Sequence, residues 1–313
     1  MTLKSLQFEL WQECNSHCTY CYLGKENRCT PVELKLNSLH NALEKISDLS
    51  NYPETEVISF LGGEFFQGQL NTPEVREGFY KLIEKVNWLL ENNYIKEFWI
   101  YATMTIGDQK DLYQMIDMIS DKSKMWILTS YDTIGRFHSQ KMFDTWDYNM
   151  RHIHELYPEI RLNTTTIITG DLIEKYLNDE FSFKDFIEKY HTSMFFKQCG
   201  RGPYTKEEMN EQVGNFFPKR EEFLKFLIKF KEQEDEYLWD KLFNIKYRAD
   251  SLYRNFNDKD RQMQLEHRIK TGKMETDNEN DMAVNKCGHL LTYAAYIDSD
   301  GCVLCDKKNV AEM

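Results

Sequence analysis

The stretch Glu13-Cys14-Asn15-Ser16-His17-Cys18-Thr19-Tyr20-Cys21-Tyr22 decides how the rest of the chain is interpreted. It places three cysteines at a C-x3-C-x2-C spacing directly after the apolar run at residues 6–11. A [4Fe-4S] cluster normally takes four cysteine ligands, so a loop that offers three leaves one iron open to another ligand. We therefore predict an iron–sulfur centre with one coordination position that the loop does not fill.

Two other uses of these cysteines fit the stretch less well. A structural zinc site would need a second pair of ligands nearby, and Cys29 has no partner at zinc-finger spacing. Disulfides are disfavoured because nothing in the chain suggests secretion and cytosolic thiols stay reduced. The eight cysteines do not read as a disulfide framework either, since six of them fall into two tight groups near the ends of the chain.

The stretch resembles the signature of the radical S-adenosylmethionine (SAM) superfamily, C-x3-C-x-aromatic-C, with Tyr20 at the aromatic position. The resemblance implies that Cys14, Cys18 and Cys21 hold a [4Fe-4S] cluster whose fourth iron chelates the amino and carboxylate groups of SAM. It also implies an activity. One-electron reduction of the cluster cleaves SAM to methionine and a 5'-deoxyadenosyl radical, which takes a hydrogen atom from the substrate.

Length and charge limit the remaining choices. A chain of 313 residues accommodates one barrel-sized domain and an appendage. Its 39 basic and 51 acidic side chains give a net charge of −12, which argues against a broad nucleic-acid-binding surface. There is no run of about eighteen apolar residues and no signal segment at Met1-Thr2-Leu3-Lys4. We therefore expect a cytoplasmic protein without a membrane span.

Hydrophobic periodicity predicts six strand–helix units in the first two thirds of the chain. The strands are expected over residues 6–11, 56–61, 97–103, 125–130, 160–168 and 193–197. The helices are expected over residues 31–49, 72–91, 108–119, 139–156, 171–178 and 183–190. This alternation indicates an α/β fold, and with the resemblance it predicts a partial (β/α)6 TIM-like barrel whose active-site loops lie at the carboxyl ends of the strands.

Residues at the ends of these strands match further parts of the family pattern. Gly62-Gly63-Glu64 resembles the GGE motif, which receives the amino group of SAM on backbone carbonyls and on the glutamate. Ser130 and Asp132 match in part a Ser-x-Asp-Gly segment that contacts SAM, with Thr133 where glycine is usual. Asn163 resembles a polar residue used against the SAM ribose or carboxylate. Ordinary turns remain the alternative for the glycine pair and for Asp132.

The second group of cysteines lies at the end of the chain. Cys287 precedes a predicted hairpin, in which a strand at residues 292–297 turns through Asp298-Ser299-Asp300-Gly301 and returns past Cys302 and Cys305. The arrangement resembles the SPASM or twitch extension of radical SAM enzymes, which holds an auxiliary [4Fe-4S] cluster. Three clustered thiolates therefore predict a second metal site.

This second site departs from the SPASM pattern in two ways. The spacing from Gly301 to Cys305 is one residue shorter than usual, and the chain stops at Met313, before the later cysteines of a full SPASM domain. A short twitch-like site is the better match, with Cys199 or Cys29 as a candidate fourth ligand. Structural zinc bound by Cys287, His289, Cys302 and Cys305 remains the alternative.

Three regions are expected along the chain. Residues 1–203 form the radical SAM core, residues 204–285 a charged helical segment and connector, and residues 286–313 the twitch-like region with its small metal-binding hairpin. The charges of the middle region indicate a solvated helix face.

The features together predict a radical SAM oxidoreductase or maturase, without naming a catalytic side chain. The expected substrate is an amino-acid side chain in a peptide or a small molecule to be oxidised, and a nucleotide or sugar metabolite is the alternative. An electron donor such as flavodoxin or ferredoxin is the expected partner. A non-catalytic iron–sulfur or zinc-stabilised protein is the alternative from another class, although it would not need Gly62-Gly63-Glu64 beside an open cluster.

Overall fold

The structure of the 313-residue chain is a computed structural model. It describes residues 5–14, 16–18, 21, 30–68, 70, 72–198, 220–234, 237–238, 242, 294–297 and 303–305, the last two segments by their backbone alone. These residues form an α/β fold around one eight-stranded sheet.

Six parallel strands make up most of the sheet and confirm the predicted alternation of strands and helices. They are β1 (Ser5–Glu9), β2 (Val57–Leu61), β3 (Glu97–Tyr101), β4 (Met125–Tyr131), β5 (Arg161–Ile168) and β6 (Thr192–Gln198). They lie in the order β6-β5-β4-β3-β2-β1, and each neighbouring pair is parallel. Among the described strands β6 pairs only with β5, so the sheet is open, as a partial (β/α)6 barrel requires.

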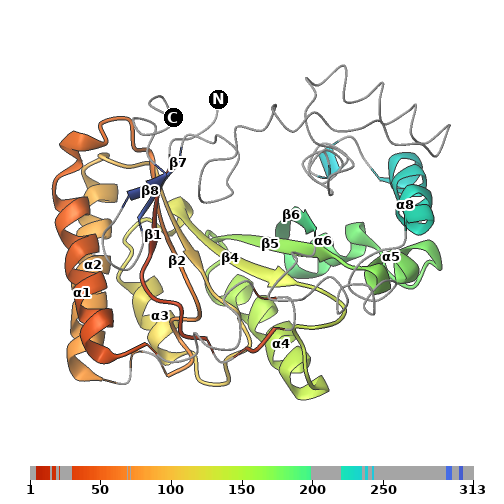
Figure 1. Ribbon diagram of the computed structural model, residues 1–313, viewed down its shortest axis with the longest axis horizontal. Helices are drawn as coiled ribbons and strands as arrows, with labels where there is room; N and C mark the ends of the chain where they lie inside the picture. Colours follow the sequence, from red (N-terminus) through yellow and green to blue (C-terminus); the bar gives the residue numbers. More distant parts are fainter. Residues whose placement is uncertain are drawn as a thin grey trace.

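Helices connect the strands, and those of the first six units begin and end within two residues of their predicted bounds. They are α1 (Val32–Ser47), α2 (Pro73–Glu91), α3 (Lys110–Asp117), α4 (Gln140–Leu156), α5 (Gly170–Leu177) and α6 (Phe183–Tyr190), with short 3-10 turns η1 (Leu49–Asn51) and η2 (Lys122–Lys124). Helices α1 and α2 lie side by side next to β1 and β2 (Figure 1). No helix in the part of the chain that the structure describes is long and apolar enough to cross a membrane.

The middle region is described only in part. Helix α8 (Arg220–Gln233) packs against α5, at the end of the molecule away from α1 (Figure 1). Of the expected segment 204–285, residues 234, 237–238 and 242 are also described, and the rest lies outside the described residues.

Local sequence explains where the helices begin. Helix α2 starts with Pro73, whose fixed φ and missing N–H suit the first turn. At the start of α4, the Ser139 hydroxyl accepts a hydrogen bond from the Met142 N–H at 3.3 Å. The residues of α2 that recur on one face are buried against the sheet: Val75, Phe79, Leu82, Ile83 and Val86.

The sheet has an apolar face toward the helices and a more polar inner face, because successive strand residues point to opposite sides. Phe8, Phe60 and Phe98 form an edge-to-face row on the helix side, with ring centroids 6.0 and 5.1 Å apart. Burial of each phenylalanine contributes about 1.5–3 kcal/mol. The alternate positions carry many polar or amphipathic side chains, among them Gln7, Glu9, Ser59, Tyr101, Ser130, Asn163 and Thr165.

The predicted C-terminal hairpin is present and joins the same sheet. Strand β7 (Ala294–Ile297) runs parallel to β1, with Ser5 opposite Ala294 and Phe8 opposite Ile297. Strand β8 (Val303–Cys305) pairs antiparallel with β7. The hairpin therefore extends the barrel sheet at the edge of the strand that leads into the cysteine loop (Figure 1).

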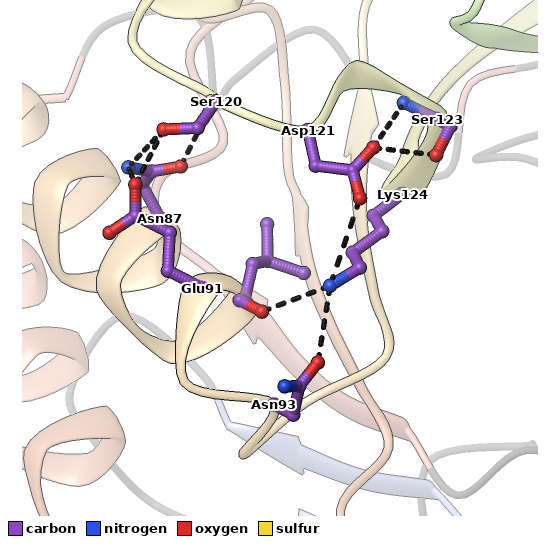
Figure 2. A network of polar contacts seen from close by, with 8 residues as sticks. Asn87, Glu91, Asn93, Ser120, Asp121, Ser123 and Lys124 are labelled. Atoms are coloured by element: carbon purple, nitrogen blue, oxygen red, sulfur yellow. Dashed lines mark hydrogen bonds and ion pairs between the residues drawn. The ribbon is translucent and has the colours of Figure 1, made fainter.

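A polar network joins the end of α2 to the segment before β4 (Figure 2). The Lys124 ammonium donates to the Leu90 carbonyl at 3.1 Å and to the Asn93 side chain at 3.3 Å. The Ser120 hydroxyl donates to Glu91 at 2.6 Å. Because α2 leads into β3 and η2 into β4, this network fixes the amino ends of these strands, opposite the carboxyl ends where the cysteine loop begins.

Candidate iron–sulfur site

The cysteine loop continues from the carboxyl end of β1. The Leu10 N–H donates to the Leu61 carbonyl at 3.1 Å, so the chain still runs beside β2 as it leaves the sheet. The free thiols of Cys14, Cys18 and Cys21 are all partly buried. The Cys21 N–H donates to the Cys18 carbonyl at 3.1 Å, which closes a tight turn between the second and third cysteines.

The surroundings of the thiols disfavour thiolates that have no cation beside them. Burial raises the pKa of Cys14 to about 11. Burial also raises the pKa of Cys18, while the positive charge of nearby Arg136 opposes this effect. A thiolate in such a place needs a cation beside it, and iron supplies one. The donor set therefore fits an iron–sulfur cluster.

A cluster and a single ion place different demands on the three thiols. Within the residues that the structure describes, no three histidine, cysteine or acidic side chains converge on one metal-ion position. Each cysteine of a [4Fe-4S] cluster binds a different iron, so its ligands do not have to meet at a point. A single zinc ion, in contrast, requires convergent ligands at about 2.3 Å.

The glycine pair after β2 lies against the backbone of the cysteine loop. The Gly63 N–H donates to the Trp11 carbonyl and the Glu64 N–H to the Glu13 carbonyl, both at 2.8 Å. A Cβ added at Gly62 would lie 2.1 Å from the Trp11 oxygen, and one at Gly63 would lie 1.9 Å from the Glu13 oxygen. Only glycine fits at these two positions. The pair thus joins the two predicted motifs into one unit.

Glu64 is fully buried at the end of β2. Its carboxylate accepts hydrogen bonds from the N–H of Phe66 at 2.8 Å and from the N–H of Thr103 after β3. Burial raises the pKa of Glu64, and these hydrogen bonds and the charge of Arg136 oppose that shift. A carboxylate oxygen can accept two hydrogen bonds, so Glu64 keeps capacity for a ligand while it ties β2 to β3.

The predicted residues of β4 and β5 lie on the same face of the sheet at different heights, with Ser130 near the carboxyl end of β4 and Asn163 near the amino end of β5. Ser130 is partly exposed and lies opposite Thr165 of β5. Asn163 is buried and donates to the Ser193 hydroxyl at 2.8 Å, while its Oδ1 atom has no hydrogen-bond partner among the described residues. Both positions fall on the inner face, where a bound molecule would meet them.

Asp132 is buried and organises the loop after β4. It accepts the Arg136 N–H at 3.1 Å, and its Oδ2 lies 3.7 Å from the Arg136 Nε. The charges of both residues act on the Cys18 thiol, which places the pair beside the cysteine loop. Asp132 therefore makes the contact expected of an ordinary turn residue, which was the alternative to a role in SAM binding. It also holds a buried arginine near the cluster ligands.

Three residues near the loop belong to no motif and were missed by sequence reasoning. Arg136 is one of them. Gln67 donates from Nε2 toward the hydroxyls of Thr105 at 2.9 Å and of Ser16 at 3.4 Å. His138 Nε2 lies 3.0 Å from the Ser16 carbonyl and 2.9 Å from the His17 carbonyl. All three belong to loops that are distant in sequence from the cysteine loop. The sequence offered one signal, which is that His138 directly precedes the residue that caps a helix.

The remaining predicted ligands cannot be placed. Tyr20, Cys199, Cys287 and Cys302 lie outside the described residues. Cys305 ends β8, where only the backbone is described, and it lies opposite Tyr296 of β7. Since Tyr296 in turn lies opposite Gln7, this cysteine is two strands away from β1.

Comparison with known proteins agrees with this centre. A protein-family model for a 4Fe-4S single cluster domain matches residues 6–143, which include the three cysteines, the glycine pair and the loop after β4. The fold and the site therefore define an α/β iron–sulfur protein. A search of curated proteins gives no match.

The solved structures that are similar to this chain include SuiB and BtrN. SuiB from Streptococcus suis, solved bound to S-adenosylmethionine, gives a TM-score of 0.50 at 14% identity over 97% of this chain. BtrN, solved in complex with AdoMet and 2-DOIA, gives a TM-score of 0.31 at 14% identity, covering 90% of this chain and 98% of BtrN. The present chain spans 60% of the length of SuiB, and their likeness shows a shared fold. The 4Fe-4S family match over residues 6–143 and this fold agree with the resemblance of the cysteine motif to the radical SAM superfamily.

Proposed function

We propose that the protein is an enzyme that binds a [4Fe-4S] cluster through Cys14, Cys18 and Cys21 and binds SAM at the remaining iron. One observation carries the proposal. The backbone that leads into the three cysteines is hydrogen-bonded to Gly63 and Glu64 at 2.8 Å, so the cysteine loop and the Gly62-Gly63-Glu64 segment form a single unit. A simple electron carrier has no use for this second loop.

Residues of the chain would hold SAM by charge and hydrogen bonding. The Glu64 carboxylate and nearby backbone carbonyls suit the ammonium group of SAM, and buried Arg136 suits its carboxylate. Ser130 and Asn163 offer a hydroxyl and an amide for the ribose. When reduced, such a cluster passes one electron to SAM, which yields methionine and a 5'-deoxyadenosyl radical able to take a hydrogen atom from the substrate.

We propose an amino-acid side chain of a peptide as the substrate. The open sheet supports this choice, because among the described strands β6 pairs only with β5 and a closed barrel would block an extended chain. The inner face would exclude water from the substrate carbon and hold it near the cofactor, which hydrogen abstraction requires. A reduced flavodoxin or ferredoxin would supply the electron.

We further propose that Cys287, Cys302 and Cys305 bind an auxiliary [4Fe-4S] cluster. The presence of the predicted hairpin supports this proposal, since β7 and β8 pair with each other and β8 ends at Cys305. Pairing of β7 with β1 brings this hairpin to the strand that carries the first cysteine loop. An auxiliary cluster at this position would accept an electron from the substrate radical or bind the substrate.

Anaerobic reconstitution tests the function directly. Protein loaded with iron and sulfide, mixed with SAM and dithionite, should produce 5'-deoxyadenosine. The variant with Cys14, Cys18 and Cys21 changed to alanine should produce none and should keep about four irons in the auxiliary cluster. Lack of 5'-deoxyadenosine from the loaded wild type would contradict the enzyme proposal. Zinc without residual iron in the triple variant would contradict the auxiliary cluster.

A further inference from the structure

We infer that His138 is a positioning residue for the iron–sulfur centre, because its imidazole holds the peptide segment between Cys14 and Cys18 in the conformation that presents both thiols. The inference rests on the cluster-binding part of the proposed function and adds a residue that the cysteine motif does not contain. It concerns the polypeptide around the cluster and is independent of the substrate.

The geometry fixes the chemical form of the ring. His138 Nε2 lies 3.0 Å from the Ser16 carbonyl oxygen and 2.9 Å from the His17 carbonyl oxygen. Carbonyl oxygens only accept hydrogen bonds, so Nε2 carries the hydrogen and shares it between the two acceptors. The neutral ring is therefore the Nε2–H tautomer, and the contact needs a donor at this atom alone.

The loop has a conformation that benefits from such a contact. His17 has a φ of 51°, in the left-handed region that residues other than glycine rarely adopt. In a helical conformation of either hand, successive carbonyls point to the same side, so the Ser16 and His17 oxygens can reach one donor. The hydrogen bonds from His138 thus stabilise a backbone turn that costs free energy by itself.

His138 is itself held by rigid neighbours on both sides. Phe137 packs against Phe143 and Trp146, with ring centroids 5.3 and 5.7 Å apart. Ser139 caps α4 through its hydroxyl at 3.3 Å from the Met142 nitrogen. The imidazole therefore projects from a fixed point of the β4–α4 loop toward a loop about 120 residues earlier in the chain.

Residue Ser16 links this contact to a cluster ligand through its two adjoining peptide groups. Its N–H donates toward the Cys14 Sγ at 3.5 Å, while its carbonyl accepts from His138. Hydrogen bonds to the sulfurs of an iron–sulfur cluster are one determinant of its reduction potential, and a donor to a thiolate favours the reduced state. Loss of the His138 contact should weaken this N–H···S hydrogen bond and make the cluster harder to reduce.

Substitutions at position 138 can separate hydrogen bonding from packing. His138→Phe keeps a ring and removes the donor. In His138→Gln the amide nitrogen reaches roughly to the place of Nε2, whereas the shorter side chain of His138→Asn ends near the place of Nδ1. His40→Phe, on an exposed position of α1, is the matched control for the aromatic replacement. All four proteins are reconstituted anaerobically beside the wild type in the full-length chain.

Two readouts are taken: the rate at which a chelator removes iron, and the midpoint potential of the cluster bound by Cys14, Cys18 and Cys21. The Cys287, Cys302 and Cys305 to alanine background leaves this cluster alone in the sample. We expect about tenfold faster iron loss in H138F and H138N. This is the lower end of the range of effects on metal affinity seen when residues that support metal ligands are changed. Both should also have a more negative potential, and H138Q and H40F should match the wild type.

The outcomes distinguish the two proposals. If the wild type takes up no cluster, the proposed function fails and this inference with it. If the wild type takes up the cluster and H138F retains iron and potential unchanged, only the role of His138 is overturned. Should H138F lose its fold by circular dichroism, H138Q decides, because a purely structural need for an imidazole would leave H138Q as defective as H138N.

Discussion

The ammonium group of Lys35 lies 2.6 Å from Oε2 of Glu13, the residue immediately before Cys14. Both side chains are largely buried, at 6% and 17% exposure. The same carboxylate oxygen accepts the Thr30 N–H at 3.2 Å, so it joins the two ends of the cysteine loop and ties them to α1. The pair therefore closes the loop at its base.

We expect Lys35→Met to destabilise the protein, because it leaves the Glu13 carboxylate in a largely buried position without its cation. Loss of one partner of a buried pair costs about 3–5 kcal/mol, and the partial exposure of Glu13 favours the lower value. Urea denaturation of the cluster-free protein measures the effect. Lys81→Met, which breaks the exposed pair with Glu77, is the control and should leave the midpoint unchanged. Equal midpoints for both variants would show that the buried pair has no special role.

Gly63→Ala should prevent cluster uptake. The added methyl would lie 1.9 Å from the Glu13 carbonyl oxygen, so the backbone that carries Cys14 would have to move away. Iron content after reconstitution measures the loss. Gly107→Ala is the matched control, because an added Cβ there meets nothing within 4 Å, and it should bind iron as the wild type does. Normal uptake by G63A would mean that the two loops are not coupled.

Arg136→Gln should weaken SAM binding without removing the cluster. A hydrogen bond to a charged group contributes about 1.5–3 kcal/mol, which corresponds to a dissociation constant about 10- to 150-fold higher. Titration of the reconstituted protein with SAM, followed by the change in its electron paramagnetic resonance spectrum, measures the constant. Arg161→Gln, at the start of β5 on the far end of the sheet, serves as the control. An unchanged constant in R136Q would remove Arg136 from the proposed SAM site.

Asp147 should make the free energy of unfolding depend on pH in the acidic range. Burial opposes its ionisation, but hydrogen bonds from Lys189, Tyr190 and Arg151 outweigh burial and lower its pKa to about 2. The contribution of a group with a lowered pKa is present above its unfolded value near 3.8 and is lost as pH falls toward 2.

Asp147→Asn tests this dependence. Since the partner cations Arg151 and Lys189 are 46% and 51% exposed, solvent screens these pairs, and we expect a difference from the wild type of only about 1 kcal/mol at pH 7. The difference should shrink between pH 4 and pH 2, as the wild-type carboxylate becomes protonated. Unfolding free energies at pH 7, 4 and 2.5 check the sign. A difference that stays constant over this range would show that protonation of Asp147 does not control stability.

Most of the fold was predictable because its signals are local. Apolar residues at helical or strand spacing predicted the six units of the barrel, and Pro73 and Ser139 marked where helices begin. The cysteine motif and the glycine pair were also visible as short patterns. The contact between the two motifs could not be predicted, because the hydrogen bond from Gly63 to Trp11 joins residues of two separate strand–helix units.

Contacts between single residues that are far apart in the chain could not be predicted from the sequence. His138 and Ser16 are 122 positions apart, and Gln67 and Ser16 are 51 apart, with no spacing rule to connect them. The C-terminal hairpin was predicted from its turn, but a turn says nothing about which strand the hairpin will join. Parallel pairing of β7 with β1 depends on the whole sheet, and neither strand carries a local signal for it.

This pairing has a consequence for the order of events during synthesis. Ala294–Ile297 leaves the ribosome long after Ser5–Glu9, so β1 waits for this partner strand while the residues between them are synthesised. Contacts between such remote segments form late, and an open strand edge invites association with other chains meanwhile. We therefore expect the nascent chain to be prone to aggregation at the strand that leads into the cysteine loop until β7 has been synthesised and pairs with it.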